Sequence, residues 1–207
     1  MTRYFVTGIG TGVGKTFVSA ILTEALKADY WKPLQCGTKE GTDKNLVCSL
    51  ISNKKSIMHN ESYCYEEPVS PHLAAALAND KIRLDKMHLP DTENVLIIEG
   101  AGGILVPLND TNFVVDLAIE FEAEIILVIK NYLGCINHSL LSIDYLIKNG
   151  FEVKGLILNG NFDPAVRLAI TNFSELPILG EIPEVTEVSK ESVLNLSQKI
   201  NLSLFDN

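Results

Sequence analysis

The sequence predicts an α/β fold in which a mostly parallel β-sheet is flanked by helices on both faces, as a three-layer sandwich. Short, continuously apolar runs bounded by Gly, Pro or Asn alternate with longer stretches whose apolar residues recur at helical spacing. Strands of this kind are buried on both faces, and the helices between them cover those faces as right-handed crossovers. The 207 residues, 46% of them hydrophobic, suit one domain covering 1–207.

Each expected element follows from its own apolar run and turn signals. The strands are expected at Tyr4–Thr7, Tyr30–Gln35, Val95–Glu99, Glu124–Lys130, Val153–Asn159 and Ile178–Ile182. The helices are expected at Lys15–Ala28, Asp43–Ser52, Pro71–Ala78, Phe113–Phe121, Asn137–Lys148, Pro164–Phe173 and Ser189–Ile200. The one long interval with little strand signal runs from residue 36 to residue 94. In an open parallel sheet such an excursion tends to reach over the ligand-binding edge.

Charge and composition exclude several classes of partner. The net charge of -9 repels nucleic acid and anionic membrane surfaces, so we expect neither as a partner. No apolar run approaches the length of a membrane span, and the N-terminus does not read as a signal peptide. We therefore expect a cytoplasmic protein, whose four scattered cysteines stay reduced.

The stretch FVTGIGTGVGKTF, residues 5–17, is typical of a phosphate-binding loop. A dinucleotide site needs G-x-G-x-x-G, and Val13 or Lys15 stands where its third glycine would be. The P-loop pattern G-x-x-x-x-G-K-[ST] matches better, with one extra residue between Gly8 and Gly14. Backbone N–H groups and the start of a helix would then face phosphate, Lys15 would neutralise its charge, and Thr16 would bind Mg²⁺. A P-loop NTPase-like fold follows.

Three further charged residues fit such a site. Glu99 closes an apolar strand and precedes a glycine turn, so we expect it at the carboxyl edge of the sheet, where Mg²⁺ needs a carboxylate. Asp43 is a candidate second carboxylate and equally a candidate N-cap for the helix from Lys44. Lys32 lies in the apolar strand segment YWKPL; it either reaches water from an edge strand or serves the phosphate site as a second cation.

Other polar residues at element ends have local explanations. Ser70 followed by Pro71 reads as a helix N-cap, and so does Asn137. From the residues alone the structural interpretation is preferred for both. Asn159 could read a base through its amide or form a simple Asn-Gly turn.

Taken in chain order, seven segments between residues 5 and 183 carry a family resemblance. They are FVTGIGTGVGKT, WKPLQCG, EEPVSPHLAA, VLIIEGAGGILVPL, LGCINH, LILNG and LGEIP. This set closely resembles the dethiobiotin synthetases, biotin-pathway enzymes of the deviant P-loop ATPase group. The combination of LGCINH, EGAGG and an N-terminal P-loop is the specific part of the resemblance.

The resemblance implies a homodimeric enzyme that uses ATP and Mg²⁺ to close a cyclic urea from 7,8-diaminononanoate and CO₂. It implies catalytic roles for Lys32, Lys15 and Thr11, and Mg²⁺ binding by Thr16, Asp43 and Glu99. The implied nucleotide contacts are Gly12, Val13, Gly14, Lys15, Thr16, Phe17, Asp43, Glu99, Gly100, Ala101, Gly102, Asn159, Gly160, Ile182, Pro183 and Glu184. The implied substrate contacts are Lys32, Cys36, Ser70, Pro71, Gly134, Cys135, Ile136 and Asn137. Among them, Asn137 is expected to bind the distant carboxylate of the substrate across the dimer interface.

Two positions depart from the family pattern. Gly12 stands where an acidic residue is expected, so the resemblance implies only backbone contacts there. Cys36 stands where a hydroxyl residue is usual.

A ParA/MinD-like switch ATPase shares the fold, but its additional P-loop lysine is missing from residues 9–11. No N-K-x-D motif supports a GTPase. A small-molecule kinase would need only a hydroxyl acceptor and stays open on the motifs alone.

Overall fold

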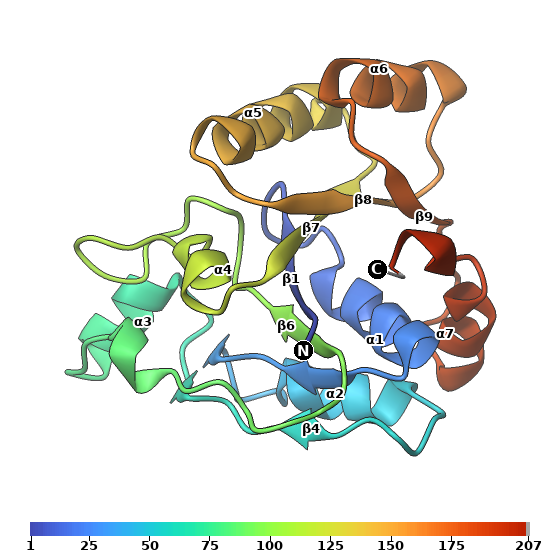
Figure 1. Cartoon of the computed structure of the whole chain (residues 1–207). Coiled ribbons are helices and arrows are strands. Elements are labelled where there is room, and N and C mark those ends of the chain that lie inside the picture. Colours follow the sequence, from blue (N-terminus) through green and yellow to red (C-terminus); the bar gives the residue numbers. More distant parts are fainter. Residues whose placement is uncertain (206–207) are drawn as a thin grey trace.

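The computed structural model describes residues 1–205, and residues 206 and 207, the end of the C-terminal tail, lie outside the described part. Its main sheet has the strand order β4-β2-β6-β1-β7-β8-β9, and every pairing in it is parallel. The strands are β1 (Arg3–Gly8), β2 (Asp29–Trp31), β4 (Met58–His59), β6 (Leu96–Glu99), β7 (Glu124–Lys130), β8 (Val153–Asn159) and β9 (Ile178–Ile182). The predicted parallel sheet is confirmed (Figure 1).

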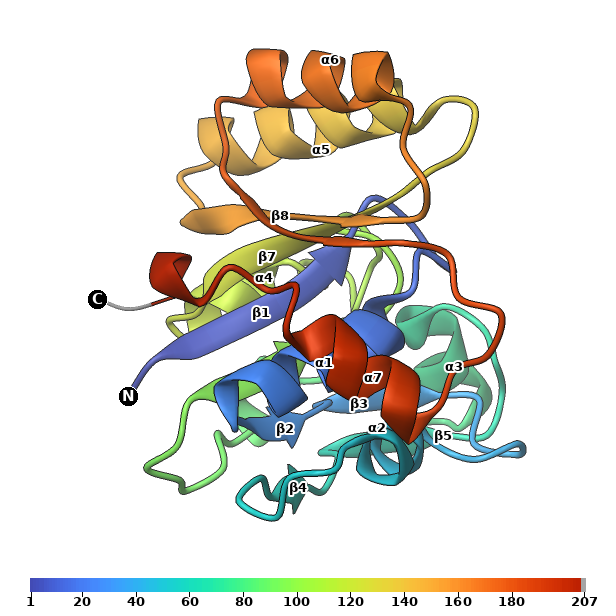
Figure 2. The ribbon, with the colours of Figure 1, turned by 90° about the vertical axis from the view of Figure 1, so that its right-hand side faces the viewer.

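Helices cover both faces of this sheet, as predicted, and each face has its own apolar core. One core joins the strands to α1 (Lys15–Leu26), α2 (Asp43–Leu50) and α7 (Lys190–Ser197). The other joins them to α4 (Asp116–Glu120), α5 (Cys135–Lys148) and α6 (Pro164–Ser174), and α5 and α6 lie side by side outside β8 (Figures 1 and 2). The remaining helical segments are α3 (Pro71–Leu77), η1 (Leu84–Lys86) and η2 (Leu202–Leu204).

The alternation of side chains along β6 decides which layer Glu99 joins. Leu96 and Ile98 pack into the core beneath α4 and α5, whereas Ile97 packs into the core beneath α1. Side chains two residues apart share a face of a strand, so Glu99 follows Ile97. The strand therefore presents Glu99 to the N-terminus of α1, at the carboxyl edge of the sheet.

The predicted strand Tyr30–Gln35 was wrong in one respect: it is two strands. β2 ends at Trp31, and after a break β3 (Leu34–Cys36) pairs with β5 (Tyr63–Tyr65) in a separate two-stranded sheet. Pro33 explains the break, because proline lacks an N–H for the ladder and restricts the residue before it. Lys32 thus lies just beyond the end of β2 and not within a strand.

The predicted start of α2 at Asp43 is confirmed, but two candidate N-caps, Asp43 and Asn137, were wrong. Thr42, and not Asp43, is the N-cap of α2, and its hydroxyl accepts a hydrogen bond from the backbone N–H of Asn45. The cap of α5 is Gly134, so Asn137 lies within its first turn. Ser70 does occupy the N-cap position of α3, although its side chain makes no capping bond. In residues 1–205 no helix combines the length and the apolar character needed to cross a membrane.

Candidate active site

The glycine-rich segment links β1 to α1 and fits tightly against the end of β8. Gly14 has a φ of 91°, which L side chains rarely adopt, and a Cβ there would overlap with the amide of Asn159. That amide donates a 2.8 Å hydrogen bond to the carbonyl of Val13. The loop conformation therefore requires glycine at position 14, and Asn159 at the end of β8 holds the loop through this hydrogen bond.

Lys15 begins α1 and is poised for an anionic ligand. It is buried, and its Nζ donates to the carbonyl oxygen of Gly10 at 3.2 Å. Burial, helped by the charge of Lys32, lowers the pKa of Lys15 to about 8 against the opposing charges of Glu99 and Asp43. A carbonyl compensates a buried ammonium less well than a phosphate does, so bound phosphate would raise the pKa of Lys15 towards its ordinary value.

Glu99 is the centre of a buried hydrogen-bonded cluster. Its side chain is 1% exposed. Its Oε1 accepts hydrogen bonds from the hydroxyl of Thr16 at 2.8 Å and from Nζ of Lys32 at 3.0 Å. Its Oε2 accepts one from the hydroxyl of Tyr30 at 2.8 Å. The buried carboxylate thus receives donors from α1, from β2 and from the segment that follows β2.

Lys32 also forms an ion pair with Asp43 at the start of α2. Burial by itself would lower the pKa of Lys32, but Glu99 and Asp43 outweigh burial and raise it. Lys32 is therefore a charged lysine between two carboxylates. Because Thr42 caps the helix, the Asp43 carboxylate is free for this contact, while the Asp43 backbone N–H donates to the side chain of Gln35 at 3.1 Å.

The donor set around Glu99 fits magnesium in the presence of a phosphate ligand. Mg²⁺ takes few protein oxygens and completes its octahedron with water and phosphate. Thr16, Asp43 and Glu99 provide a hydroxyl and two carboxylates beside the glycine-rich loop. Among residues 1–205 no cluster of three or more His, Cys, Asp or Glu side chains could hold a metal by itself.

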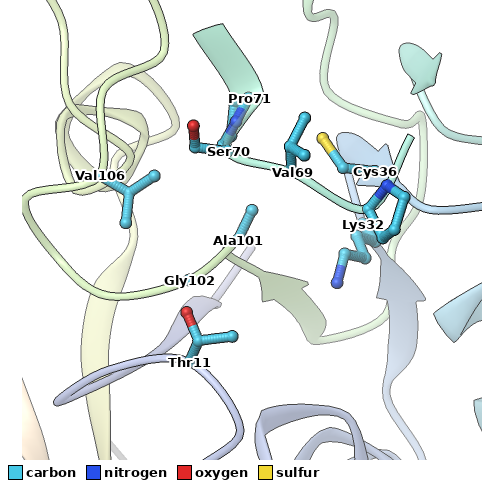
Figure 3. Close-up of a pocket in the computed structure, with 10 residues that line it drawn as sticks. Thr11, Lys32, Cys36, Val69, Ser70, Pro71, Ala101, Gly102 and Val106 are labelled. Carbon is cyan, nitrogen blue, oxygen red and sulfur yellow. The ribbon is translucent and has the colours of Figure 1, made fainter. Parts of the chain in front are cut away.

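A pocket of about 380 Å³ opens beside this cluster. Figure 3 shows the Lys32 ammonium in it, with Thr11 on one side and Ser70 and Pro71 on the other. Apolar groups make most of the wall, so the pocket suits an aliphatic chain with a negative group at Lys32. Its full lining is Thr11, Lys32, Cys36, Pro68, Val69, Ser70, Pro71, Ala101, Gly102 and Val106. Burial raises the pKa of the Cys36 thiol to about 11 against the opposing charge of Lys32, so the thiol is neutral.

The expected nucleotide contacts gather at the same sheet edge. Asn159 ends β8 and Gly160 follows it, and the Gly160 N–H donates to the carbonyl of Ile182 at 2.8 Å where β9 ends. The Glu184 N–H donates to the Asn161 side chain at 3.3 Å, which ties the next loop to the same place. Of the others, Gly12 and Val13 lie in the glycine-rich loop and Phe17 in the first turn of α1. The turn after β6 holds Gly100, Ala101 and Gly102, and Pro183 follows the end of β9.

One predicted group does not join the pocket within a single chain. None of Gly134, Cys135, Ile136 and Asn137 is among the lining residues. They form the cap and first turn of α5, where Cys135 is buried and Asn137 is exposed. Their predicted contact with the substrate stays a prediction.

Sequence reasoning missed Tyr30, which holds the second oxygen of Glu99. The available signal was its place in an apolar strand two residues before Lys32, which puts both side chains at one end of β2. A tyrosine in such a strand usually serves the core, so the pattern alone gave no reason to select it.

Comparison with known proteins decides the family. A family model described as "AAA domain" matches residues 2–192. An ATP-dependent dethiobiotin synthetase of Cytophaga hutchinsonii is 46% identical over 100% of this chain and 98% of its own. Another, of Christiangramia forsetii, is 43% identical over 97% of both. This chain belongs to the ATP-dependent dethiobiotin synthetase family. The resemblance seen in the motifs is thereby confirmed, and the chain shares the full length of these family members.

Solved structures of two cell division ATPases share the fold of this chain. The cell division ATPase MinD of Pyrococcus furiosus aligns with a TM-score of 0.57 over 96% of this chain and 98% of its own, at 15% identity. MinD of Pyrococcus horikoshii, complexed with Mg-ADP, aligns with a TM-score of 0.50 over 97% and 96%, at 17% identity. At such identities the likeness concerns the fold alone, and confirms the predicted P-loop NTPase-like class.

Proposed function

We propose that this chain is an ATP-dependent dethiobiotin synthase, which closes a cyclic urea on 7,8-diaminononanoate with CO₂ and forms ADP and phosphate. The observation that carries the proposal is the charged Lys32 of the Glu99 cluster, which projects into an apolar pocket beside a P-loop. Membership of the dethiobiotin synthetase family supports the same reaction. A switch ATPase has no evident use for an apolar pocket that ends at a lysine.

The proposed reaction has three steps. One amine of the substrate adds to CO₂ and loses a proton, which gives a carbamate. A carbamate oxygen then attacks the γ-phosphorus of ATP, and ADP leaves. Finally the second amine attacks the carbamate carbon, the C–O bond breaks, phosphate leaves with the electron pair, and the amine proton is lost to solvent. Negative charge gathers at the second step, where two anionic groups must meet.

The residues of the chain would serve that step by holding charge and position. Lys32 would bind the carbamate in the pocket, and Lys15 the γ-phosphoryl group beside the glycine-rich loop. Thr11 would contact the same region from the opposite side of the pocket. Ser70, Pro71 and Cys36 would fix the aliphatic chain, Cys36 as a neutral thiol.

Thr16, Asp43 and Glu99 would hold Mg²⁺, which supplies charge neutralisation for the phosphates when bound. In the described chain, Lys32 is the cation beside Asp43 and Glu99. We infer that Lys32 would turn its ammonium towards the carbamate when Asp43 and Glu99 hold the metal instead. Asn159, with the backbone at 182–184, would contact the adenine.

The substrate's distant carboxylate would be bound by the cap and first turn of α5 from a second subunit, with Asn137 as a side-chain donor. This part of the proposal makes the active form a homodimer of one-domain subunits. It is motivated by the exposure of Asn137 and its absence from the pocket lining.

The test is a reaction with the diamine, MgATP and ¹³C-labelled bicarbonate, followed by mass spectrometry. The label is expected in the ureido carbon of a cyclised product, and ADP formation is expected to require both the diamine and bicarbonate. A kinase would form a phosphorylated diamine without bicarbonate, and a switch ATPase would form ADP without the diamine. Either result would refute the proposed function.

A further inference from the structure

The two oxygens of Glu99 face different surroundings. Oε1 accepts hydrogen bonds from Thr16 and Lys32, so it is the oxygen directed towards the proposed metal site. Oε2 is directed away from that site and accepts a 2.8 Å hydrogen bond from Tyr30. Tyr30 has no part in the reaction proposed above, yet it is the residue that separates the roles of the two oxygens.

The strand register explains how Tyr30 reaches Glu99. In the parallel pairing of β2 with β6, Tyr30 lies opposite Ile97, and Glu99 is two residues further along the same face. The Tyr30 ring is fully buried in the core beneath α1, where Ile97 is its neighbour. The ring is therefore fixed by packing, and its hydroxyl cannot follow a carboxylate that turns away.

A glutamate carboxylate by itself is poorly oriented. Its terminal torsion is broad and roughly two-fold, so packing of the aliphatic part does not decide which way the oxygens point. A charge-assisted hydrogen bond from a fixed donor to one oxygen removes that freedom. Carboxylates that bind metals are in turn held by hydrogen bonds from such outer partners, and loss of a partner weakens metal binding.

We propose that Tyr30 is a positioning residue for Glu99, whose hydroxyl fixes the rotation of the carboxylate so that Oε1 is presented to Mg²⁺ in the nucleotide complex. The inference rests on the proposed function, because that function makes Glu99 a metal ligand. A purely structural role, in which Tyr30 only fills the core, predicts loss of stability without loss of metal affinity.

The chain offers a matched control in Tyr4. Tyr4 lies opposite the same Ile97 from the other side, on β1, and is equally buried in the same core. Its hydroxyl donates to the carbonyl of Phe205 at 3.4 Å, near the C-terminal end of the described chain. Tyr4→Phe and Tyr30→Phe each remove one buried hydroxyl, from the two strands that flank β6, but only Tyr30→Phe removes a donor to Glu99.

The experiment is a Mn²⁺ titration of the ADP-bound protein, followed by electron paramagnetic resonance, with thermal unfolding measured on the same samples. Tyr30→Phe is expected to weaken Mn²⁺ binding about tenfold, and Tyr4→Phe to leave it within twofold of wild type. In steady-state assays the half-saturating Mg²⁺ concentration of Tyr30→Phe should rise while turnover at saturating Mg²⁺ changes much less. Wild-type Mn²⁺ affinity in Tyr30→Phe would overturn the inference, as would equal weakening in both variants.

Glu99→Gln distinguishes failure of the inference from failure of the proposed function. If Glu99→Gln weakens Mn²⁺ binding and Tyr30→Phe does not, Glu99 keeps its metal role and the positioning role alone is refuted. If neither variant affects Mn²⁺ binding, both roles at Glu99 are refuted. The Mn²⁺ titration needs only nucleotide, so its result stands apart from the product assay with labelled bicarbonate.

Discussion

Lys32 and Glu99, 67 positions apart in the chain, meet at 3.0 Å in an environment where the Glu99 side chain is 1% exposed and that of Lys32 7%. Each would be a costly buried charge without the other, since breaking a buried pair typically costs 3–5 kcal/mol. The pairing offsets the cost of keeping a buried cation in the wall of a mostly apolar pocket. That arrangement links the stability of the fold to the proposed chemistry.

Lys32→Met should therefore separate chemistry from folding. We expect turnover to fall by a factor of about 100 or more, because a cation that stabilises developing charge contributes about 3 kcal/mol or more to catalysis. Far-UV circular dichroism should stay native, with a lower melting temperature. The matched control is Lys39→Met, which removes an exposed lysine that pairs with Glu67 on a nearby loop. Near-normal turnover of Lys32→Met would remove Lys32 from the site.

The depressed pKa of Lys15 predicts proton uptake when nucleotide binds. With a pKa of about 8 in the free protein, roughly half of the Lys15 side chains are neutral at pH 8. Phosphate favours the charged form, so binding raises the pKa, and about half a proton per site should be taken up at pH 8. The uptake should fade below pH 6.5, where Lys15 is already charged.

Calorimetry of AMPPNP binding in buffers of different ionisation enthalpy measures this uptake. Lys15→Arg is the control, because an arginine side chain stays protonated throughout. If wild type and Lys15→Arg take up the same number of protons at pH 8, the uptake comes from another group and the prediction is wrong.

The glycine-rich loop predicts a graded series of alanine substitutions. At Gly10 a Cβ meets nothing within 4 Å and φ is ordinary, so Gly10→Ala should leave the free energy of unfolding unchanged. Gly12 has the same space but a φ of 72°, so Gly12→Ala should cost about 1–2 kcal/mol. Gly14→Ala should cost more than either, because its Cβ would also overlap with Asn159. Urea unfolding without nucleotide measures the series, and any other order would contradict the loop conformation.

The fold and most of the site could be predicted because their signals are local in the sequence. Apolar strands with glycine turns fix the carboxyl edge of the sheet, and the P-loop spacing selects Lys15 and Thr16 at that edge. β7 and β8 begin and end at the predicted residues, because each is a continuous apolar run. These elements can be recognised without knowing which segments they pack against.

The missed features depend on contacts between distant segments. β4 and β5 have only two and three residues, and they exist because β2 and β3 provide edges for them to pair with. The break at Pro33 could have been predicted, because proline lacks an N–H and restricts the residue before it. The break leaves Lys32 outside the strands, beside Glu99. The contact of Tyr30 with Glu99 needs the register of β2 on β6, which no local pattern gives.

A shared active site predicts complementation between two defective subunits. If Asn137 serves the pocket of its partner, a dimer of one Lys32→Met subunit and one Asn137→Ala subunit contains one site with both defects and one with neither. Co-refolding the two variants in equal amounts should restore about a quarter of wild-type sites, since half of the dimers are mixed and each has one intact site. Activity is measured at a diamine concentration too low for Asn137→Ala alone to work. If Asn137 instead serves its own chain, each site of a mixed dimer keeps one defect, and no activity returns. Mixing Lys32→Met with Lys15→Met is the control, because both lysines lie in one subunit's pocket region and no mixed dimer regains an intact site.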